Sequence, residues 1–233
     1  MKILAIDTSG PVCGVSVLVD DAIRYECAVC NKLTHSANLM PMVDAALTAS
    51  GLALKDVDRI AVVVGPGSFT GVRIGVSTVK AMAHGAGKPC VAIDALEAMA
   101  AGITDFDGII CPIQDARAGQ VYGAAFTAGM PPKRLLPDAP MKLEEYVRAI
   151  ETLGERFLFL GDGMPVHRAR LAEMLGDKAV FASPQHAFLR PASVAALGNL
   201  AAEELDYLQL MPLYLRAPNA ERCKQLVEAQ NAQ

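Results

Sequence analysis

The sequence predicts an α/β protein built from two copies of one supersecondary unit. Short apolar stretches alternate with amphipathic stretches of helical periodicity along the chain. A strand that ends in aspartate and turns into another strand occurs at Asp7 and again at Asp115. A strand that runs through glycine into a helix occurs at Gly65 and again at Gly161. Because the copies lie about a hundred residues apart, we expect a duplicated architecture of mixed sheets flanked by helices.

The first copy opens with three short strands separated by turns, which is typical of an antiparallel meander. Apolar residues at helical spacing, including Leu39 and Val43, then predict a helix that Gly51 ends. A fully apolar strand follows, as is usual for a parallel strand, and leads through glycines into a second helix. The expected strands are 2–7, 14–19, 22–30, 59–64 and 90–93, and the expected helices are 36–50, 70–84 and 96–101.

The second copy repeats this order. An apolar strand ends just before Asp115, a short turn reverses the chain, and another strand returns. The expected strands are 108–114, 121–127, 133–136, 156–160 and 179–181, and the expected helices are 143–152, 166–175 and 191–206. We therefore expect one lobe at 1–105, a second lobe at 106–216 and a tail at 217–233.

Composition excludes several classes of function. The 233 residues include 21 Lys and Arg against 25 Asp and Glu, and the resulting net charge of −4 is not that of a protein that binds nucleic acid by global charge. With no Trp and 5% aromatic residues, extensive base-stacking surfaces are not expected. No signal peptide or membrane-spanning run is visible, and the six scattered cysteines fit reduced thiols. We expect a cytoplasmic protein that has no contact with membrane.

The loop at residues 65–71 is the sharpest local motif. Gly65, Gly67 and Gly71 lie between an apolar strand and a helix, where bare backbone N–H groups at a helix N-terminus can bind an anion. The spacing matches neither a dinucleotide fingerprint, nor a P-loop, nor a nucleophile elbow. The alternative is a tight strand-to-helix crossing, in which only glycine lets two backbones approach. The sequence leaves both interpretations open.

Two aspartates and one arginine share the same ambiguity. Asp7 and Asp115, at strand ends, can hold a hydrated metal near phosphates or can form Asx turns. Arg117 can clamp a phosphate or can simply occupy a hairpin. The four histidines form no i,i+4 pair, and the Cys27–Cys30 spacing has no second cysteine pair nearby, so no metal site is expected.

Five segments, in order along the chain, resemble the bacterial TsaB (YeaZ) family. The most specific is the block Gly-Pro-Gly-Ser-Phe-Thr-Gly-Val-Arg-Ile-Gly at 65–75. The others are the opening strand and turn at 3–9, His35 with Leu39 and Pro41, the Asp-Ala-Arg hairpin at 115–117 with the Val-Tyr pair at 121–122, and the Pro-x-Tyr-x-Arg segment at 211–216. One departure is Ala-Gly-Gln at 118–120, where the family usually carries bulkier or charged residues.

The resemblance implies a fold like that of actin, the sugar kinases and the heat-shock ATPases. It implies a non-catalytic adaptor subunit that binds the catalytic paralogue TsaD and helps to recruit the TsaE ATPase. That complex transfers a threonylcarbamoyl group to the adenosine 3′ of the anticodon in tRNAs that read codons starting with A. This chain lacks the His-x-x-x-His metal pair of TsaD. Accordingly, we expect no catalytic residues, no metal and no required cofactor, with tRNA contacted through the complex.

The resemblance also implies which residues form sites. The first two helices would form the interface with TsaD, or with a second copy when the chain is isolated, through His35, Leu39, Met42, Val43, Val72, Arg73, Val76 and Val79. On this hypothesis a glutamate at Val76 or Val79 breaks association and leaves the monomer folded. A vestigial phosphate site would comprise Asp7, Thr8, Ser9, Gly65, Gly67, Ser68, Gly71, Asp115 and Arg117. Weak ADP or ATP binding would occur at this site or at the interface.

Two other functions remain as alternatives. A stand-alone small-molecule kinase or ATPase would use Asp7, the 65–71 loop and Asp115, and would bind ATP and magnesium tightly. A metallopeptidase would require bound metal, for which the sequence shows neither ligands nor a nucleophile motif.

Overall fold

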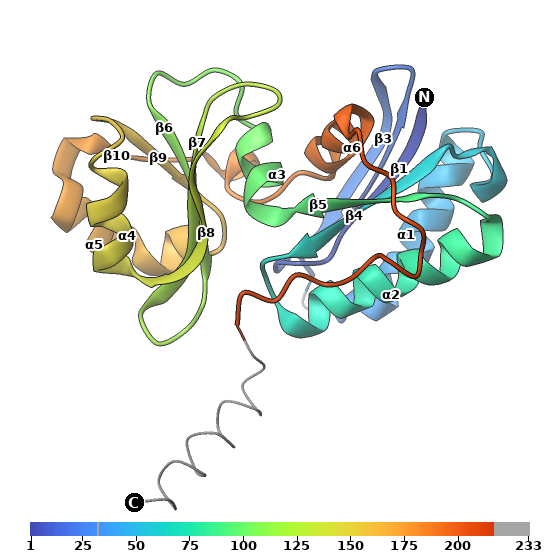
Figure 1. Cartoon of the computed structure of the whole chain (residues 1–233), viewed down its shortest axis with the longest axis horizontal. Helices are drawn as coiled ribbons and strands as arrows, with labels where there is room; N and C mark the ends of the chain where they lie inside the picture. Colours follow the sequence, from blue (N-terminus) through green and yellow to red (C-terminus); the bar gives the residue numbers. More distant parts are fainter. Residues whose placement is uncertain (32, 217–233) are drawn as a thin grey trace, which may run out of the picture.

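A computed structural model describes residues 1–31 and 33–216 and shows two five-stranded mixed sheets flanked by helices (Figure 1). The predicted α/β class is confirmed. In the first sheet the strand order is β3-β2-β1-β4-β5, and in the second it is β8-β7-β6-β9-β10. Each strand of the first sheet therefore has its counterpart in the second, and the duplication expected from the sequence is present. The expected tail at 217–233 lies outside the described residues.

The first sheet contains a meander followed by parallel strands. The antiparallel strands are β1 (Lys2–Asp7), β2 (Cys13–Val19) and β3 (Ala22–Val29), and the parallel ones that follow are β4 (Arg59–Gly65) and β5 (Cys90–Asp94). Its helices are α1 (His35–Ala49), α2 (Phe69–Ala86) and α3 (Ala95–Ala101), with a 3-10 turn, η1, at Leu54–Asp56. The Ser68 hydroxyl accepts a hydrogen bond from the Gly71 N–H and thereby caps α2.

The second sheet has the same plan. It comprises β6 (Ile109–Asp115), β7 (Gln120–Thr127), β8 (Arg134–Lys142), β9 (Phe157–Leu160) and β10 (Ala179–Phe181). The remaining helices are α4 (Leu143–Ile150), α5 (Gly163–Leu175) and α6 (Pro191–Leu200), with 3-10 turns η2 (Gly176–Lys178) and η3 (Pro184–His186). In the described part of the chain, no helix combines the length and apolarity needed to cross a membrane.

Two predicted boundaries are wrong for identifiable reasons. The helix expected at 191–206 ends at Leu200, because Leu205 exchanges two backbone hydrogen bonds of 2.8 Å with Cys90 at the edge of the first sheet. The strand expected at 133–136 continues to Lys142 through Pro137 and Pro140. Both prolines fit there because β8 is an edge strand, in which a missing N–H does not break a ladder on both sides.

Three apolar clusters form the core. One lies between the first sheet and helices α1 and α2, and another lies between the second sheet and helices α4 and α5. The third fills the space between the two sheets and contains α3 and α6 (Figure 1). Helix α6 packs on β1 and β2 although it follows the second sheet in the chain. The lobe boundaries at 105/106 and 216/217 stay a prediction. Through α6, the chain returns from the second sheet to the first and so connects the two lobes.

The prediction that apolar side chains of α1 and α2 form a partner interface is wrong. Leu39, Met42, Val43, Val72, Val76 and Val79 are all at most 8% exposed and belong to the core beneath these helices. The wide apolar stripe arises because each helix is buried by the sheet and also by its neighbour. Of the other two interface candidates, half-buried His35 donates from Nε2 to the Gly10 carbonyl at 2.9 Å, whereas Arg73 is exposed.

Candidate functional site

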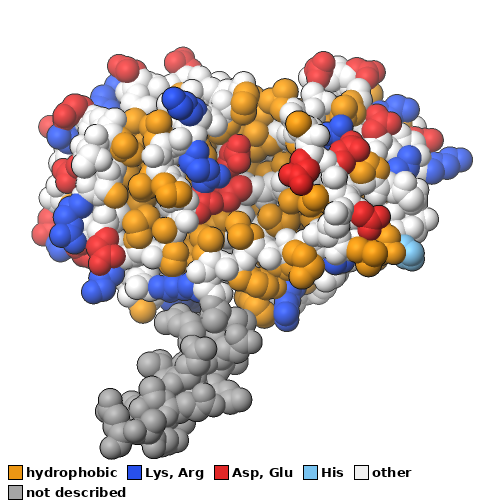
Figure 2. Space-filling view, viewed as in Figure 1, with side chains coloured by type: hydrophobic (Ala, Val, Ile, Leu, Met, Phe, Trp, Pro, Cys, Tyr) orange, Lys and Arg blue, Asp and Glu red, His pale blue; other side chains and the backbone are white. Residues whose placement is uncertain are grey.

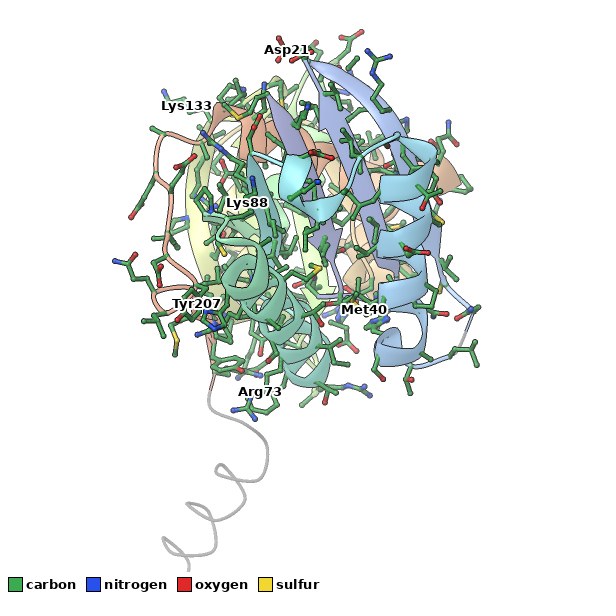
Figure 3. The ribbon with its side chains drawn as sticks, turned by 90° about the vertical axis from the view of Figure 1, so that its right-hand side faces the viewer. Asp21, Met40, Arg73, Lys88, Lys133 and Tyr207 are labelled. Carbon is green, nitrogen blue, oxygen red and sulfur yellow. The ribbon has the colours of Figure 1, made fainter. Side chains whose placement is uncertain are left out.

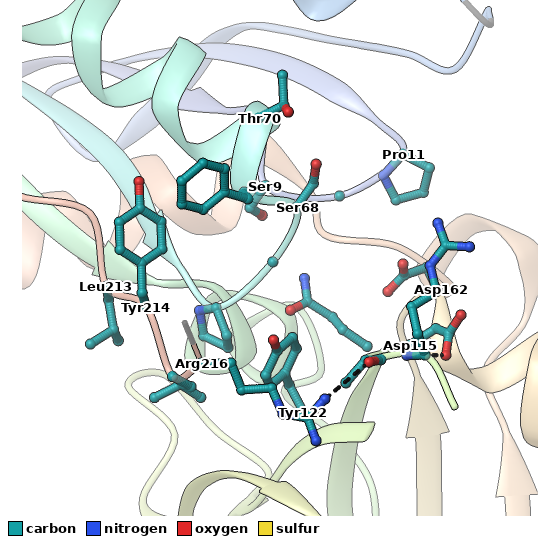
Figure 4. Close-up of a pocket in the computed structure, with 18 residues that line it drawn as sticks. Ser9, Pro11, Ser68, Thr70, Asp115, Tyr122, Asp162, Leu213, Tyr214 and Arg216 are labelled. Atoms are coloured by element: carbon teal, nitrogen blue, oxygen red, sulfur yellow. Dashed lines mark hydrogen bonds between the residues drawn. The ribbon is translucent and has the colours of Figure 1, made fainter. Parts of the chain in front are cut away.

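A cleft of about 480 Å³ lies between the two sheets (Figure 4). The first sheet contributes the turn after β1, with Ser9, and the loop between β4 and α2, with Ser68. The second sheet contributes the β6–β7 hairpin, with Asp115, and Asp162 at the start of α5. Residues 213–216 complete the wall. The duplicated strand–turn–strand and strand–glycine–helix units therefore face each other across the cleft.

Asp7 and Asp115 form matching Asx turns. Asp7 Oδ1 accepts hydrogen bonds from the N–H of Ser9 at 2.8 Å and from the hydroxyl of Ser9 at 2.7 Å. Asp115 Oδ1 accepts from the N–H of Arg117 at 2.9 Å. Burial raises the pKa of Asp7, and the two bonds from Ser9 oppose this shift. Both aspartates therefore form the Asx turns that were one of the two alternatives predicted for them.

The glycine loop packs tightly on the turn that follows β1. A Cβ at Gly67 would collide with the carbonyl oxygen of Ser9, and a Cβ at Gly71 would collide with that of Thr8. The Ser68 N–H donates to the Ser9 carbonyl at 2.7 Å, and the Thr8 hydroxyl donates to the Gly71 carbonyl at 2.7 Å. Gly67 and Gly71 are therefore explained by the predicted alternative to an anion site, a tight crossing in which two backbones approach closely. Phosphate binding by this loop stays a prediction.

The structure brings together only part of the predicted phosphate set. Ser9, Gly67, Ser68, Asp115 and Arg117 line the cleft. The other four lie outside this lining and take part in the hydrogen bonds and close backbone contacts of the two loops: Asp7, Thr8, Gly65 and Gly71.

Sequence reasoning missed Gln114, Tyr122, Asp162, Tyr214 and Arg216 as site residues. A signal existed for Asp162, which follows the second strand–glycine unit, but nothing local marked Gln114, an amide at the end of an apolar strand. In the described ranges 1–31 and 33–216, no three His, Cys, Asp or Glu side chains gather in a way that could hold a metal ion.

The last described segment, residues 201–216, forms a strap from the first sheet to the second. Its Leu213 N–H donates to the Val64 carbonyl at 2.7 Å, and Lys80 Nζ donates to the Leu210 carbonyl at 3.1 Å. At its end, Arg216 donates to the Ala116 carbonyl of the β6–β7 hairpin at 3.2 Å. The strap carries exposed apolar side chains such as Leu208 and contributes to the hydrophobic surface in the centre of Figure 2.

Asp162 is the acid with the clearest electrostatic perturbation in the cleft. Its pKa is raised to about 6, mainly by burial and further by the negative charge of Asp115. Its Oδ1 has no hydrogen-bond partner within residues 1–31 and 33–216. The folded chain therefore holds a proton on this carboxyl at pH values where the unfolded chain has released it.

We expect Asp162→Asn to stabilise the protein in a pH-dependent way. Between the unfolded pKa of 3.8 and the folded pKa of about 6, the folded state binds more protons, so wild-type stability falls as pH rises through this window. The asparagine variant carries no ionisable group at this position, so its stability does not fall with pH in this way. Its gain over wild type should grow from pH 4 to pH 7 by up to about 3 kcal/mol, measured by urea unfolding at each pH. A gain that is independent of pH would contradict the burial of this charge.

Two duplicated lobes around a cleft form a fold that the chain shares with a sugar kinase. A solved inorganic polyphosphate/ATP-glucomannokinase from Arthrobacter matches 84% of this chain and 97% of its own, with a TM-score of 0.50 and 14% identity, a likeness of fold alone. A solved Pseudomonas aeruginosa protein described as similar to peptidase YeaZ superposes with a TM-score of 0.77 and 26% identity, over 92% of this chain and 99% of that one.

Sequence relatives narrow the class to one family. The Bacillus subtilis tRNA threonylcarbamoyladenosine biosynthesis protein TsaB is 36% identical over 95% of this chain and 96% of its own. The Escherichia coli protein of the same name is 38% identical over 54% of this chain and 55% of its own. Residues 31–224 match the model of the family TsaD, tRNA N6-adenosine threonylcarbamoyltransferase. The chain belongs to the TsaB (YeaZ) family, and the resemblance seen in the sequence is confirmed.

Proposed function

We propose that this chain is a non-catalytic adaptor subunit of the machinery that makes threonylcarbamoyladenosine in tRNA. It binds and supports the catalytic paralogue TsaD, helps to recruit the TsaE ATPase, and contacts tRNA through the complex in the cytoplasm. The observation that carries this proposal is the 36% identity to a TsaB protein over almost the full length of both chains. The adaptor requires no cofactor of its own.

The fold supports association with a paralogue. Residues 31–224 match the TsaD family model, so the two partners share one architecture and can pair in the pseudo-symmetric manner of a self-dimer. Because the apolar stripe of α1 and α2 is buried, the contact must use the outward sides of these helices. Six exposed residues there, small or apolar except for Arg73, form what we call the partner face: Met40, Pro41, Ala45, Arg73, Ser77 and Ala81.

The partner face fits helix-to-helix contact. Figure 3 shows α1 and α2 on the outer side of the first sheet, with Met40 on α1 and Arg73 near the start of α2. Met40 is 48% exposed, which leaves a large apolar side chain to bury in a complex. Arg73 is held in place, because its Nε donates to the Tyr214 hydroxyl at 3.0 Å and its guanidinium lies 4.3 Å from the centre of the Phe69 ring.

The proposal is tested by mixing the purified chain with TsaD and measuring molecular mass by light scattering after gel filtration. We expect a one-to-one heterodimer, and a self-dimer for the chain alone that is displaced by TsaD. Two peaks at the masses of the separate proteins, at concentrations of about 10 μM, would show that no complex with a Kd of about 1 μM or below forms, and would contradict the adaptor role.

A stand-alone kinase or ATPase is the second candidate function. The observation that favours it is the cleft itself, where Ser9, Ser68, Asp115 and Arg117 meet between two lobes. Such an enzyme would bind magnesium and ATP through Asp115 and lose this binding in Asp115→Ala. We expect the isolated chain to show no ATP turnover above a buffer control. Turnover that disappears in the variant would favour the kinase instead.

A further inference from the structure

Gln114 is a buried polar side chain in the wall of the interlobe cleft. It is 2% exposed, and neither its Oε1 nor its Nε2 has a hydrogen-bond partner in the described part of the chain. Buried amides are normally hydrogen-bonded, because an unmade bond leaves the full desolvation cost of the group. A side-chain amide with both groups unpaired is complementary to a ligand that presents a donor beside an acceptor.

Strand register places this side chain on the cleft side of the second sheet. Along β6, Ile110 belongs to the core between the sheets, whereas Cys111 and Ile113 belong to the core beneath α4 and α5. Side chains alternate across a strand, so Gln114 shares the face of Ile110. It stands at the end of the strand, where this face passes from the apolar core into the cleft.

A flat aromatic surface lies beside the amide. Tyr122 of β7 is directly opposite Gln114 in the antiparallel register, so both side chains project from the same face. Tyr122 lines the cleft, and the guanidinium of Arg216 lies 6.0 Å from the centre of its ring (Figure 4). The cleft volume of about 480 Å³ is that of an ordinary small-molecule site.

We propose that the interlobe cleft binds a small molecule whose amide-like donor–acceptor edge pairs with Gln114 against the face of Tyr122. Two kinds of compound carry such an edge. A 6-aminopurine presents its N6–H beside N7, and a carboxamide presents its N–H beside its oxygen. The Ser68 N–H already donates to the Ser9 carbonyl, and the proposed recognition uses the Gln114 amide rather than the backbone N–H groups of the glycine loop. The proposal does not depend on the adaptor role.

The test is calorimetric titration of the full chain with adenosine and with L-glutamine as probes. Inosine and L-glutamate are the matched ligands, because each replaces the donor of the edge with an acceptor. We expect adenosine or glutamine to bind with a Kd below about 1 mM, and its matched ligand to bind at least about tenfold more weakly. The probe that binds shows whether the ligand is a 6-aminopurine or a carboxamide. No binding of either probe up to about 10 mM, or equal binding of both members of each pair, would overturn the proposal.

The variant Gln114→Leu separates recognition from structure. It removes two buried unpaired atoms, so the melting temperature of the unliganded chain should stay unchanged or rise, while binding of the active probe weakens at least about tenfold. Gln185→Leu, at an exposed position, is the matched control and should change neither. Where Gln114→Leu does not fold, Gln114→Asn keeps the amide but shortens its reach and should also weaken binding. Unchanged binding in a folded variant would show that the amide is structural.

Discussion

We expect Val79→Glu to unfold the chain, whereas Ala81→Glu, two residues further along α2, leaves it folded and abolishes association with TsaD. Val79 is completely buried in the core beneath α1 and α2, and Ala81 is exposed on the partner face. An unpaired charge at Val79 costs more than about 3 kcal/mol, a large share of the stability of a typical domain. The same charge at Ala81 remains in water until a partner covers it.

Circular dichroism and gel filtration with TsaD measure both outcomes. The Val79 variant should lose its cooperative thermal transition, and the Ala81 variant should keep the transition but elute apart from TsaD. If Val79→Glu folds normally and only loses its partner, the core described for this helix is wrong. If Ala81→Glu still forms the heterodimer, the partner face lies elsewhere.

The second large effect is expected for Gly71→Ala. Alanine is normally favoured over glycine in a helix by about 1 kcal/mol, but here its methyl group would collide with the backbone carbonyl of Thr8. Neither backbone can move freely, because the Thr8 hydroxyl donates to the Gly71 carbonyl. We therefore expect a loss of about 2 kcal/mol or more in the free energy of unfolding.

A matched control lies on the same helix. At Gly85 the added methyl group would meet nothing within 4 Å, and the position is exposed. Gly85→Ala should therefore stabilise the chain by roughly 0.5–1 kcal/mol in urea unfolding. If the free energy of unfolding falls in Gly71→Ala and rises in Gly85→Ala, the result supports a close backbone contact between the glycine loop and Thr8. A stabilising Gly71→Ala would show that the loop does not pack on Thr8 as described.

Local patterning predicted most of the fold. The two strand–aspartate–turn units and the two strand–glycine–helix units lie at equivalent places in the two sheets, because hydrophobic periodicity and glycine placement are local properties. The ends of β8 and α6 were not predictable in this way. They depend on the free edge of the second sheet and on the pairing of Leu205 with Cys90, which are contacts between distant parts of the chain.

The candidate site was predicted less completely. The sequence marked Ser9, Ser68 and Asp115, which stand next to turns and glycines, and the structure places all three at the cleft. It gave no indication of Gln114, whose importance depends on the absence of a partner among the described residues. The apolar stripes of α1 and α2 misled the prediction, because a helix buried by a sheet and by a second helix has the same sequence pattern as a helix with an exposed apolar face.

The adaptor role is tested most directly by reconstitution with this chain left out. TsaD, TsaE, tRNA, ATP and the threonylcarbamoyl-adenylate synthase with its substrates are incubated with and without the chain, and the modified nucleoside is quantified by mass spectrometry. We expect sustained modification only when the chain is present, and none from the chain alone. Equal modification without the chain, with partners from the same organism, would contradict the adaptor role and direct attention to nucleotide-dependent chemistry in the cleft.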